Sequence, residues 1–133
     1  MDMTITFPGG KRVDAAYDGF LISTDQPTDE GGQDTAPSPL LYCLASLGTC
    51  AGYYVLSYLQ ARGLPTDGVK LLQSHEADEK TGKLKKFGIT IQVPPEIPEK
   101  HHKPLARSAE KCTVKKLMED RPVFEIRTET AGG

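Results

Sequence analysis

This 133-residue chain contains three cysteines, and they are its best candidates for chemical reactivity. Cys43 and Cys50 lie seven residues apart in the apolar stretch CLASLGTCAGYYV, and Cys112 lies in a second stretch, SAEKCTVKKL. In a helix, seven residues separate two Cα atoms by about 10.5 Å along the axis. A disulfide requires Cα atoms within roughly 7 Å of one another. If Cys50 has an intramolecular partner, that partner is therefore Cys112.

Two cysteines on facing helices can either pack or react. A thiolate attacks the O–O bond of a peroxide and becomes a sulfenic acid, which a second thiol converts to a disulfide that an external thiol reduces. Buried cysteines also serve as small hydrophobic residues. Cys43, which lies among leucines, is interpreted in that way, whereas the spacing leaves both roles open for Cys50 and Cys112.

The elements that would position these cysteines begin with a long apolar helix. Ser38 is a suitable N-cap, Pro39 fits the first helical position, and Gly63 favours termination, so we predict a helix from 39 to 62. Apolar residues recur at helical spacing along it: Leu40, Leu44, Leu47, Ala51, Tyr54 and Tyr58. Gly48 and Gly52 are poor helix formers. We interpret them as a strip that lets another helix approach and leaves Cys50 accessible.

The rest of the chain predicts an α+β fold with the order βββ-α-ββ-α-β in a single domain, 1–133. A Gly68–Ala77 and Leu84–Val93 hairpin follows the long helix. A second helix is predicted from about Glu99 to Asp120, and its apolar face changes near Thr113, where Val114, Leu117 and Met118 could begin a separate short turn of helix. The predicted strands outside that hairpin are 4–7, 12–17, 20–24 and 123–128.

Composition indicates a soluble globular protein with a net charge of −2. Its basic residues are scattered, which argues against a nucleic-acid partner. No stretch approaches the roughly 20 apolar residues of a membrane span, and the first residues do not resemble a signal peptide. An odd number of cysteines without a disulfide framework favours a reducing, cytoplasmic location.

Other side chains that could do chemistry have simpler interpretations. His75, His101 and His102 lack the spacing of metal ligands, so we expect no metal site. Tyr53 and Tyr54, like Tyr58, could line a pocket beside Cys50 but are more typical of a core or an interface.

The run APSPLLYCLASLGTCAGYYVLSYLQARG, the following hairpin and the run RSAEKCTVKKL together resemble the OsmC/Ohr family over nearly the whole chain. The resemblance implies an intertwined homodimer with the long helices buried at its centre. It also implies that Cys50 is the peroxidatic cysteine and Cys112 the resolving one, in a site at the subunit interface. Members of that family reduce organic hydroperoxides with external dithiols such as the lipoyl group, without a metal or bound cofactor.

The sequence departs from the family pattern at the partners of the reactive thiol. Leu40 occupies the position of a glutamate that holds an N-terminal arginine in peroxidase members, and Thr113 replaces a frequent proline. Arg12, the one arginine of the N-terminal strands, is our candidate for electrostatic assistance. Without the carboxylate we expect the pKa of Cys50 to stay near the ordinary value of about 8.5, which predicts a slow enzyme.

Three functions remain compatible with the sequence. The first is a thiol-dependent hydroperoxide reductase that forms a Cys50–Cys112 disulfide and belongs to the oxidative stress response. The second is a non-enzymatic dimer that binds a small apolar ligand, with the cysteines as packing or redox-sensing groups. The third is a purely structural dimer in which neither cysteine reacts with peroxide.

Overall fold

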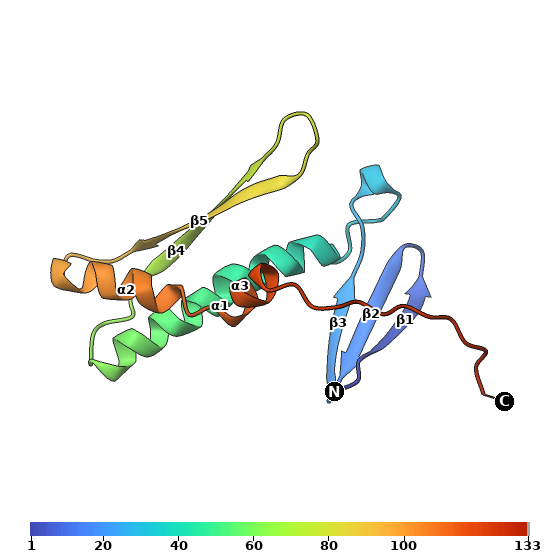
Figure 1. The fold of residues 1–133 in the computed structure, drawn as a ribbon, viewed down its shortest axis with the longest axis horizontal. Helices are drawn as coiled ribbons and strands as arrows, with labels where there is room; N and C mark the ends of the chain where they lie inside the picture. The colour runs from blue at the N-terminus through green and yellow to red at the C-terminus, as the bar shows by residue number, and fades with distance from the viewer. Residues whose placement is uncertain (133) are drawn as a thin grey trace. The chain divides into compact units, whose positions relative to one another are not determined.

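The computed structural model describes residues 1–132 and contains two compact units, which meet in sequence between Ser46 and Leu47 (Figure 1). The first unit contains strands β1 to β3. The second contains the β4–β5 hairpin and helices α2 and α3, while the long helix α1 begins in the first unit and ends in the second. Mixed helices and antiparallel sheets confirm the predicted α+β class.

The first unit is the predicted three-stranded antiparallel meander of β1 (Thr4–Gly9), β2 (Arg12–Tyr17) and β3 (Phe20–Thr24). Asp18 and Gly19 join β2 to β3, and both have a positive φ, +48° and +83°. Positive φ at both central residues is what a two-residue type I′ hairpin requires. The Asp-Gly pair therefore sets the register in which Tyr17 opposes Phe20.

A buried carboxylate organises the loop that leads from β3 towards α1. Asp25 accepts hydrogen bonds from the Thr35 hydroxyl (2.5 Å), the Thr35 N–H (3.1 Å) and the Gln26 N–H (2.7 Å). These donors, the Thr35 hydroxyl first among them, lower the pKa of Asp25 to about 2. One ionised side chain therefore joins the two ends of a segment rich in Pro and Gly, which contains the short 3₁₀ helix Thr28–Glu30.

Helix α1 (Pro39–Ala61) begins where the sequence predicts, because the Ser38 hydroxyl accepts a hydrogen bond from the Leu41 N–H (3.2 Å). One stripe of the helix is buried, at a spacing of four residues: Leu47, Ala51, Val55 and Leu59. This stripe provides the apolar surface on which the second unit assembles.

The second unit packs a hairpin and a short helix on α1 (Figure 1). The hairpin pairs β4 (Lys70–Ala77) with β5 (Leu84–Gln92), and α2 (His102–Ala109) follows the 3₁₀ turn Glu99–His101. The buried core consists of Val55 and Leu59 of α1, Ile97 of the β5–α2 connection and Leu105 of α2, with β4 and β5 side chains packed against it.

Two predicted elements differ from the structure. The second helix is divided into α2 and α3 (Thr113–Glu119), with Cys112 between them rather than inside a helix. The final strand, predicted at 123–128, is absent: residues 121–132 form neither helix nor strand. A strand needs a hydrogen-bonding neighbour, and the part of the chain that the structure describes places none beside this segment, where Val123 and Ile126 are more than 90% exposed.

The prediction that no segment is apolar enough to span a membrane was also wrong. By length and composition α1 could cross a bilayer, since its 23 residues include no charged side chain. The same composition is found in core helices of soluble proteins, so this is weak evidence for a membrane location.

We predict that Asp25→Asn lowers the urea midpoint of the protein at pH 7, because a neutral amide replaces a carboxylate that three donors stabilise. The folded pKa of about 2 lies below the unfolded value, so the contribution of Asp25 is present above about pH 4 and is lost towards pH 2. The two proteins should therefore converge in stability as the pH falls. Asp29→Asn, at an exposed position of the same loop, is the control. Parallel curves for Asp25→Asn and wild type across this range would contradict the assignment.

Candidate active site

The second unit brings Cys50 and Cys112 together, as the sequence predicts for any intramolecular pair. Cys50 lies in the middle of α1 and is half-buried, whereas Cys112 is only 2% exposed. The Cys112 thiol donates to the Leu47 carbonyl (3.7 Å between Sγ and O), and Leu47 precedes Cys50 by three residues on α1. Both sulfurs are free thiols in this structure.

The break between α2 and α3 determines which groups Cys50 meets. Cys112 has an extended backbone (φ −48°, ψ 116°) and acts as the N-cap of α3, because its sulfur accepts a hydrogen bond from the Lys115 N–H (3.4 Å). The N–H groups of Thr113 and Val114, at the start of α3, are among the donors that act on the pKa of Cys50. A continuous helix would have used such N–H groups in its own hydrogen bonds.

These contacts lower the pKa of Cys50, contrary to the expectation that it stays near its ordinary value. The largest cause is the hydrogen bond from the Val114 N–H. Burial of the thiol opposes it, and hydrogen bonds from the Cys112 thiol and from the N–H and hydroxyl of Thr113 act in the same direction as Val114. Hydrogen bonds that favour the charged form stabilise a thiolate without requiring a cation.

Sequence reasoning assigned no functional role to Val114, which it placed at the start of a possible separate turn of helix, or to Thr113, which it noted as a departure from the family pattern and as the point where the apolar face changes. The Thr113 hydroxyl lies 3.3 Å from the Tyr54 hydroxyl, and Tyr54 lies one helical turn after Cys50. A hydroxyl residue directly after a cysteine at a predicted change of helix face was the signal available in the sequence.

The two glycines beside Cys50 make room for β4 rather than for a second helix. A Cβ atom on Gly48 would collide with Oε1 of Gln73, and one on Gly52 would make ordinary contact with Leu71 (4.0 Å). Gln73 lies across the helix and hydrogen bonds with His75 (2.7 Å between their Nε2 atoms). The predicted small-residue strip therefore exists, but side chains of a strand cover it.

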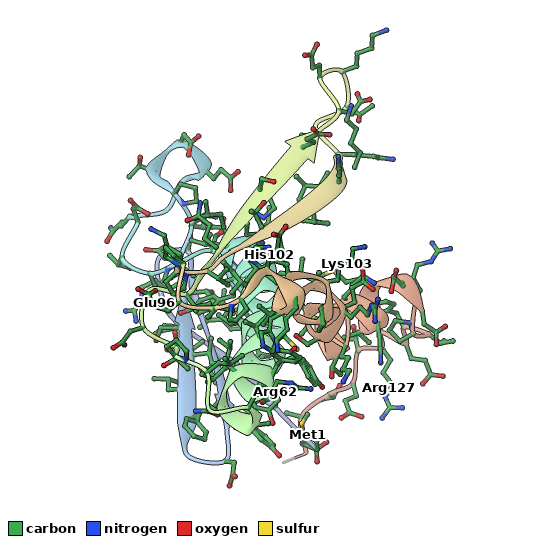
Figure 2. The ribbon with its side chains drawn as sticks, turned by 90° about the vertical axis from the view of Figure 1, so that its left-hand side faces the viewer. Met1, Arg62, Glu96, His102, Lys103 and Arg127 are labelled. Carbon is green, nitrogen blue, oxygen red and sulfur yellow. The ribbon has the colours of Figure 1, made fainter. Side chains whose placement is uncertain are left out.

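A cavity of about 760 Å³ lies within the second unit. Cys112 lines it, and Cys50 is not among its lining residues. Its walls are mostly apolar side chains of β5 and the helices, such as Phe87, Ile89 and Leu105, and its polar groups include His102, which Figure 2 labels on α2. A small apolar molecule could occupy such a space.

The tyrosines and histidines have other contacts. Tyr53, Tyr54 and Tyr58 are not among the residues that line the cavity. The Tyr58 hydroxyl lies 2.8 Å from Nδ1 of His101, and the Arg62 guanidinium stacks on the Tyr58 ring. Within residues 1–132, no group of three His, Cys, Asp or Glu side chains is arranged to hold a metal ion.

Three other residues singled out in the sequence belong to the first unit. Arg12 is half-buried on β2 and lines a small pocket with Asp25. Leu40 and Cys43 lie in the first part of α1, and both are exposed. The interpretation of Cys43 as a buried packing residue is therefore wrong for the single chain. The role predicted for Arg12 at Cys50 remains a prediction.

Comparison with known proteins shows that this chain belongs to the OsmC-like protein family, whose model matches residues 31–127. The match includes Cys50, Cys112 and the turn between α2 and α3, and it confirms the resemblance seen in the sequence. No curated protein matches the chain.

Solved structures with the same fold include an osmotic stress induced and detoxification response protein of Psychrobacter arcticus, with a TM-score of 0.71 and 22% identity over 86% of this chain and 85% of that one. An OsmC-like protein of Mycoplasma pneumoniae has a TM-score of 0.69 and 14% identity over 90% and 86% of the two chains. The organic hydroperoxide resistance protein OhrB of Bacillus subtilis has a TM-score of 0.51 and 20% identity over 90% and 93%. At these identities the likeness establishes the fold.

The different surroundings of the two glycines predict different effects of alanine. Gly52→Ala should stabilise the protein by up to about 1 kcal/mol, since alanine is the better helix former and its methyl group has room. Gly48→Ala should gain less or lose stability, because Gln73 must move. Urea denaturation measures both, and Gly48→Ala combined with Gln73→Ala should recover the helix-propensity gain. Equal gains in the two single variants would show that Gln73 is not held over Gly48.

Proposed function

We propose that the protein is a thiol-dependent hydroperoxide reductase in which Cys50 attacks the peroxide and Cys112 resolves the product. The observation that carries the proposal is that the break between α2 and α3 brings the Cys112 sulfur to α1, 3.7 Å from the carbonyl oxygen of Leu47, which precedes Cys50 by three residues. Family membership and solved neighbours that are organic hydroperoxide resistance proteins, including one from Legionella pneumophila, support the same class of reaction.

Exposure and pKa favour Cys50 for the first step. Cys50 is half-buried and hydrogen bonds lower the pKa of its thiol, whereas Cys112 is buried. The Cys50 thiolate attacks one oxygen of the peroxide ROOH, the O–O bond breaks, and the departing alkoxide takes a proton to become the alcohol ROH. Cys50 is left as a sulfenic acid, having given up two electrons.

Cys112 is suited to the second step because its sulfur lies at the Leu47 carbonyl, three residues before Cys50 on α1. Its thiol loses a proton and its sulfur attacks the Cys50 sulfur, which forms the disulfide and releases the hydroxyl group as water. An external dithiol then exchanges with the disulfide and becomes oxidised itself, and both protein thiols return. A reducing cytoplasm would supply such a reductant.

One equivalent of an organic hydroperoxide, such as cumene hydroperoxide, should oxidise the reduced protein to a single intramolecular disulfide. Intact mass after alkylation under denaturing conditions should show the loss of two hydrogen atoms and one alkylated thiol. Peptide mapping should identify the bridge as Cys50–Cys112 and the alkylated residue as Cys43.

The cysteine variants separate the two roles. Cys50→Ser should abolish oxidation, whereas Cys112→Ser should stop at the Cys50 sulfenic acid, which a dimedone adduct traps. Cys43→Ser is the matched control and should behave as wild type, because Cys43 lies exposed in the other unit. Three alkylated thiols after treatment of the wild type would refute the peroxidase proposal.

We also propose that the protein acts as a homodimer through α1. This helix has no charged residue, yet several of its large side chains are exposed in the single chain, among them Tyr53 (61%) and Leu56 (41%). Exposed apolar surface on this scale is typical of an interface.

Light scattering during gel filtration should therefore give twice the chain mass of 14.5 kDa. Tyr53→Lys should shift the protein to a monomer, because a lysine at an exposed apolar interface position would be buried without a partner on association. Gln60→Lys, at another exposed position of α1, is the control and should stay dimeric. A wild-type monomer would overturn the proposal, as would a protein that leaves the membrane fraction only with detergent.

The cavity of about 760 Å³ supports a second candidate, a non-enzymatic protein that binds a small apolar ligand. The two candidates differ in their dependence on Cys50. A binding protein keeps its ligand after Cys50→Ser, since Cys50 does not line the cavity. A peroxidase with the same substitution no longer reduces the hydroperoxide.

A further inference from the structure

The cavity of the second unit has one thiol in its wall. Cys112 is only 2% exposed, yet it is among the residues that line the cavity. Both hydrogen-bond partners of its sulfur belong to lining residues as well: the Leu47 carbonyl of α1, at 3.7 Å, and the Lys115 N–H of α3, at 3.4 Å. The Cys112 sulfur is therefore held between two parts of the cavity wall.

Cys50 lies to one side of this space. Leu47 and Ala51 line the cavity from α1, and a spacing of four residues puts them on one face of the helix. Cys50 directly precedes Ala51, so its side chain is turned by about 100° around the helix from that of Ala51. Cys50 does not line the cavity. A small molecule in the cavity therefore meets Cys112, whereas one that reaches Cys50 comes from elsewhere.

We propose that the cavity is the binding site of the external dithiol, which attacks the Cys112 sulfur of the oxidised protein and expels Cys50 as a thiolate. The proposal rests on the proposed function, because the Cys50–Cys112 disulfide is the form that is reduced. It gives the cavity an occupant, and it separates the approach of the reductant from that of the peroxide.

The exchange consists of two displacements at sulfur. A thiolate of the dithiol bonds to the Cys112 sulfur, the bond between Cys112 and Cys50 breaks, and its electron pair leaves on Cys50. The second thiol of the reductant then loses its proton and attacks the reductant's own sulfur in the mixed disulfide, which expels Cys112 as a thiolate. The two thiolates take up the two protons that the dithiol released. Two electrons have passed to the protein, and the dithiol has become a disulfide.

The leaving group favours the same direction of attack. In thiol–disulfide exchange, the thiol with the lower pKa leaves faster. Hydrogen bonds lower the pKa of the Cys50 thiol. Attack at Cys112 therefore expels the thiolate that these bonds stabilise, in agreement with the position of Cys112 in the cavity wall.

The lining of the cavity suits a compact dithiol on a carbon chain. Its volume is about 760 Å³, and apolar side chains such as Phe87, Ile89 and Met118 form much of its wall. A carbon chain with two thiols brings few polar groups that would lose their water on entry. Lys85 and His102 also line the cavity and provide partners for a polar end of the reductant.

The first test identifies the attacked sulfur. The full-length Cys43→Ser protein, which lacks the exposed cysteine, is oxidised with cumene hydroperoxide or diamide and given a short pulse of mercaptoethanol. A monothiol has no second thiol, so an acid quench and N-ethylmaleimide can trap the mixed disulfide. Peptide mass spectrometry should find the mercaptoethanol adduct on Cys112 at least about tenfold more often than on Cys50. Adducts found mainly on Cys50, or equally on both, would overturn the proposal.

The second test determines whether the reductant passes through the cavity. Ala106 of α2 lines the cavity and is itself exposed, so a tryptophan there narrows the cavity without having to fit into the core. Ala106→Trp should slow reduction of the disulfide by dithiothreitol about three- to tenfold and leave the rate of its formation by peroxide unchanged. Arg107→Trp is the matched control, because Arg107 is exposed and does not line the cavity. Equal reduction rates in the two variants would overturn the cavity route.

A third measurement separates this proposal from the peroxidase itself. With Cys43→Ser and Cys50→Ser combined, Cys112 is the one remaining cysteine, and its exchange with dithiodipyridine needs neither peroxide nor Cys50. Adding Ala106→Trp should slow this exchange, and adding Arg107→Trp should not. That pattern, together with a wild-type protein that peroxide does not oxidise, would sustain the cavity as the route to Cys112 and refute the peroxidase. Normal disulfide formation with mercaptoethanol adducts on Cys50 would do the reverse.

Discussion

The thiol of Cys50 lies in the middle of an uncharged helix, so the groups that lower its pKa come from elsewhere in the chain. Cys50 lies on α1, whose 23 residues include no lysine, arginine or histidine. The hydrogen-bond donors come instead from the turn between α2 and α3, where the N–H groups of Thr113 and Val114 meet the sulfur. The packing of the second unit positions this turn. The stripe that ends at Leu59 buries α2 against α1, and the interruption at Cys112 exposes donors that an unbroken helix would have consumed.

Cys112 performs two physical tasks in this arrangement. As a cap, its sulfur accepts the Lys115 N–H and fixes the start of α3. As a thiol, it donates to the Leu47 carbonyl of α1. A disulfide with Cys50 would engage the same sulfur in a covalent bond and take away the thiol proton that it donates. Oxidation would therefore alter the contacts that hold the turn, so the redox state of the pair and the local structure at the start of α3 are coupled.

The sequence predicted features that depend on local rules. Hydrophobic spacing located α1, Ser38 located its start, and Asp18-Gly19 located a hairpin, because each rests on neighbours within a few residues. Chain geometry excluded a Cys43–Cys50 pair and left Cys112. The break at Cys112 could not be fixed in this way: α3 is short, and its start depends on a cap made by a cysteine, which is not a usual capping residue.

The predictions that failed depend on contacts between distant parts of a chain or between chains. The pKa of Cys50 was assigned from the absence of a charged partner, although neutral donors 63 and 64 residues away in sequence lower it. The segment 123–128 alternates like a strand but has no neighbour among the described residues of the single chain. Strand propensity of this kind is conditional on an available edge. An apolar segment without such an edge, together with an uncharged helix whose tyrosines and leucines are exposed, is understandable if the sequence is adapted to an assembly larger than one chain.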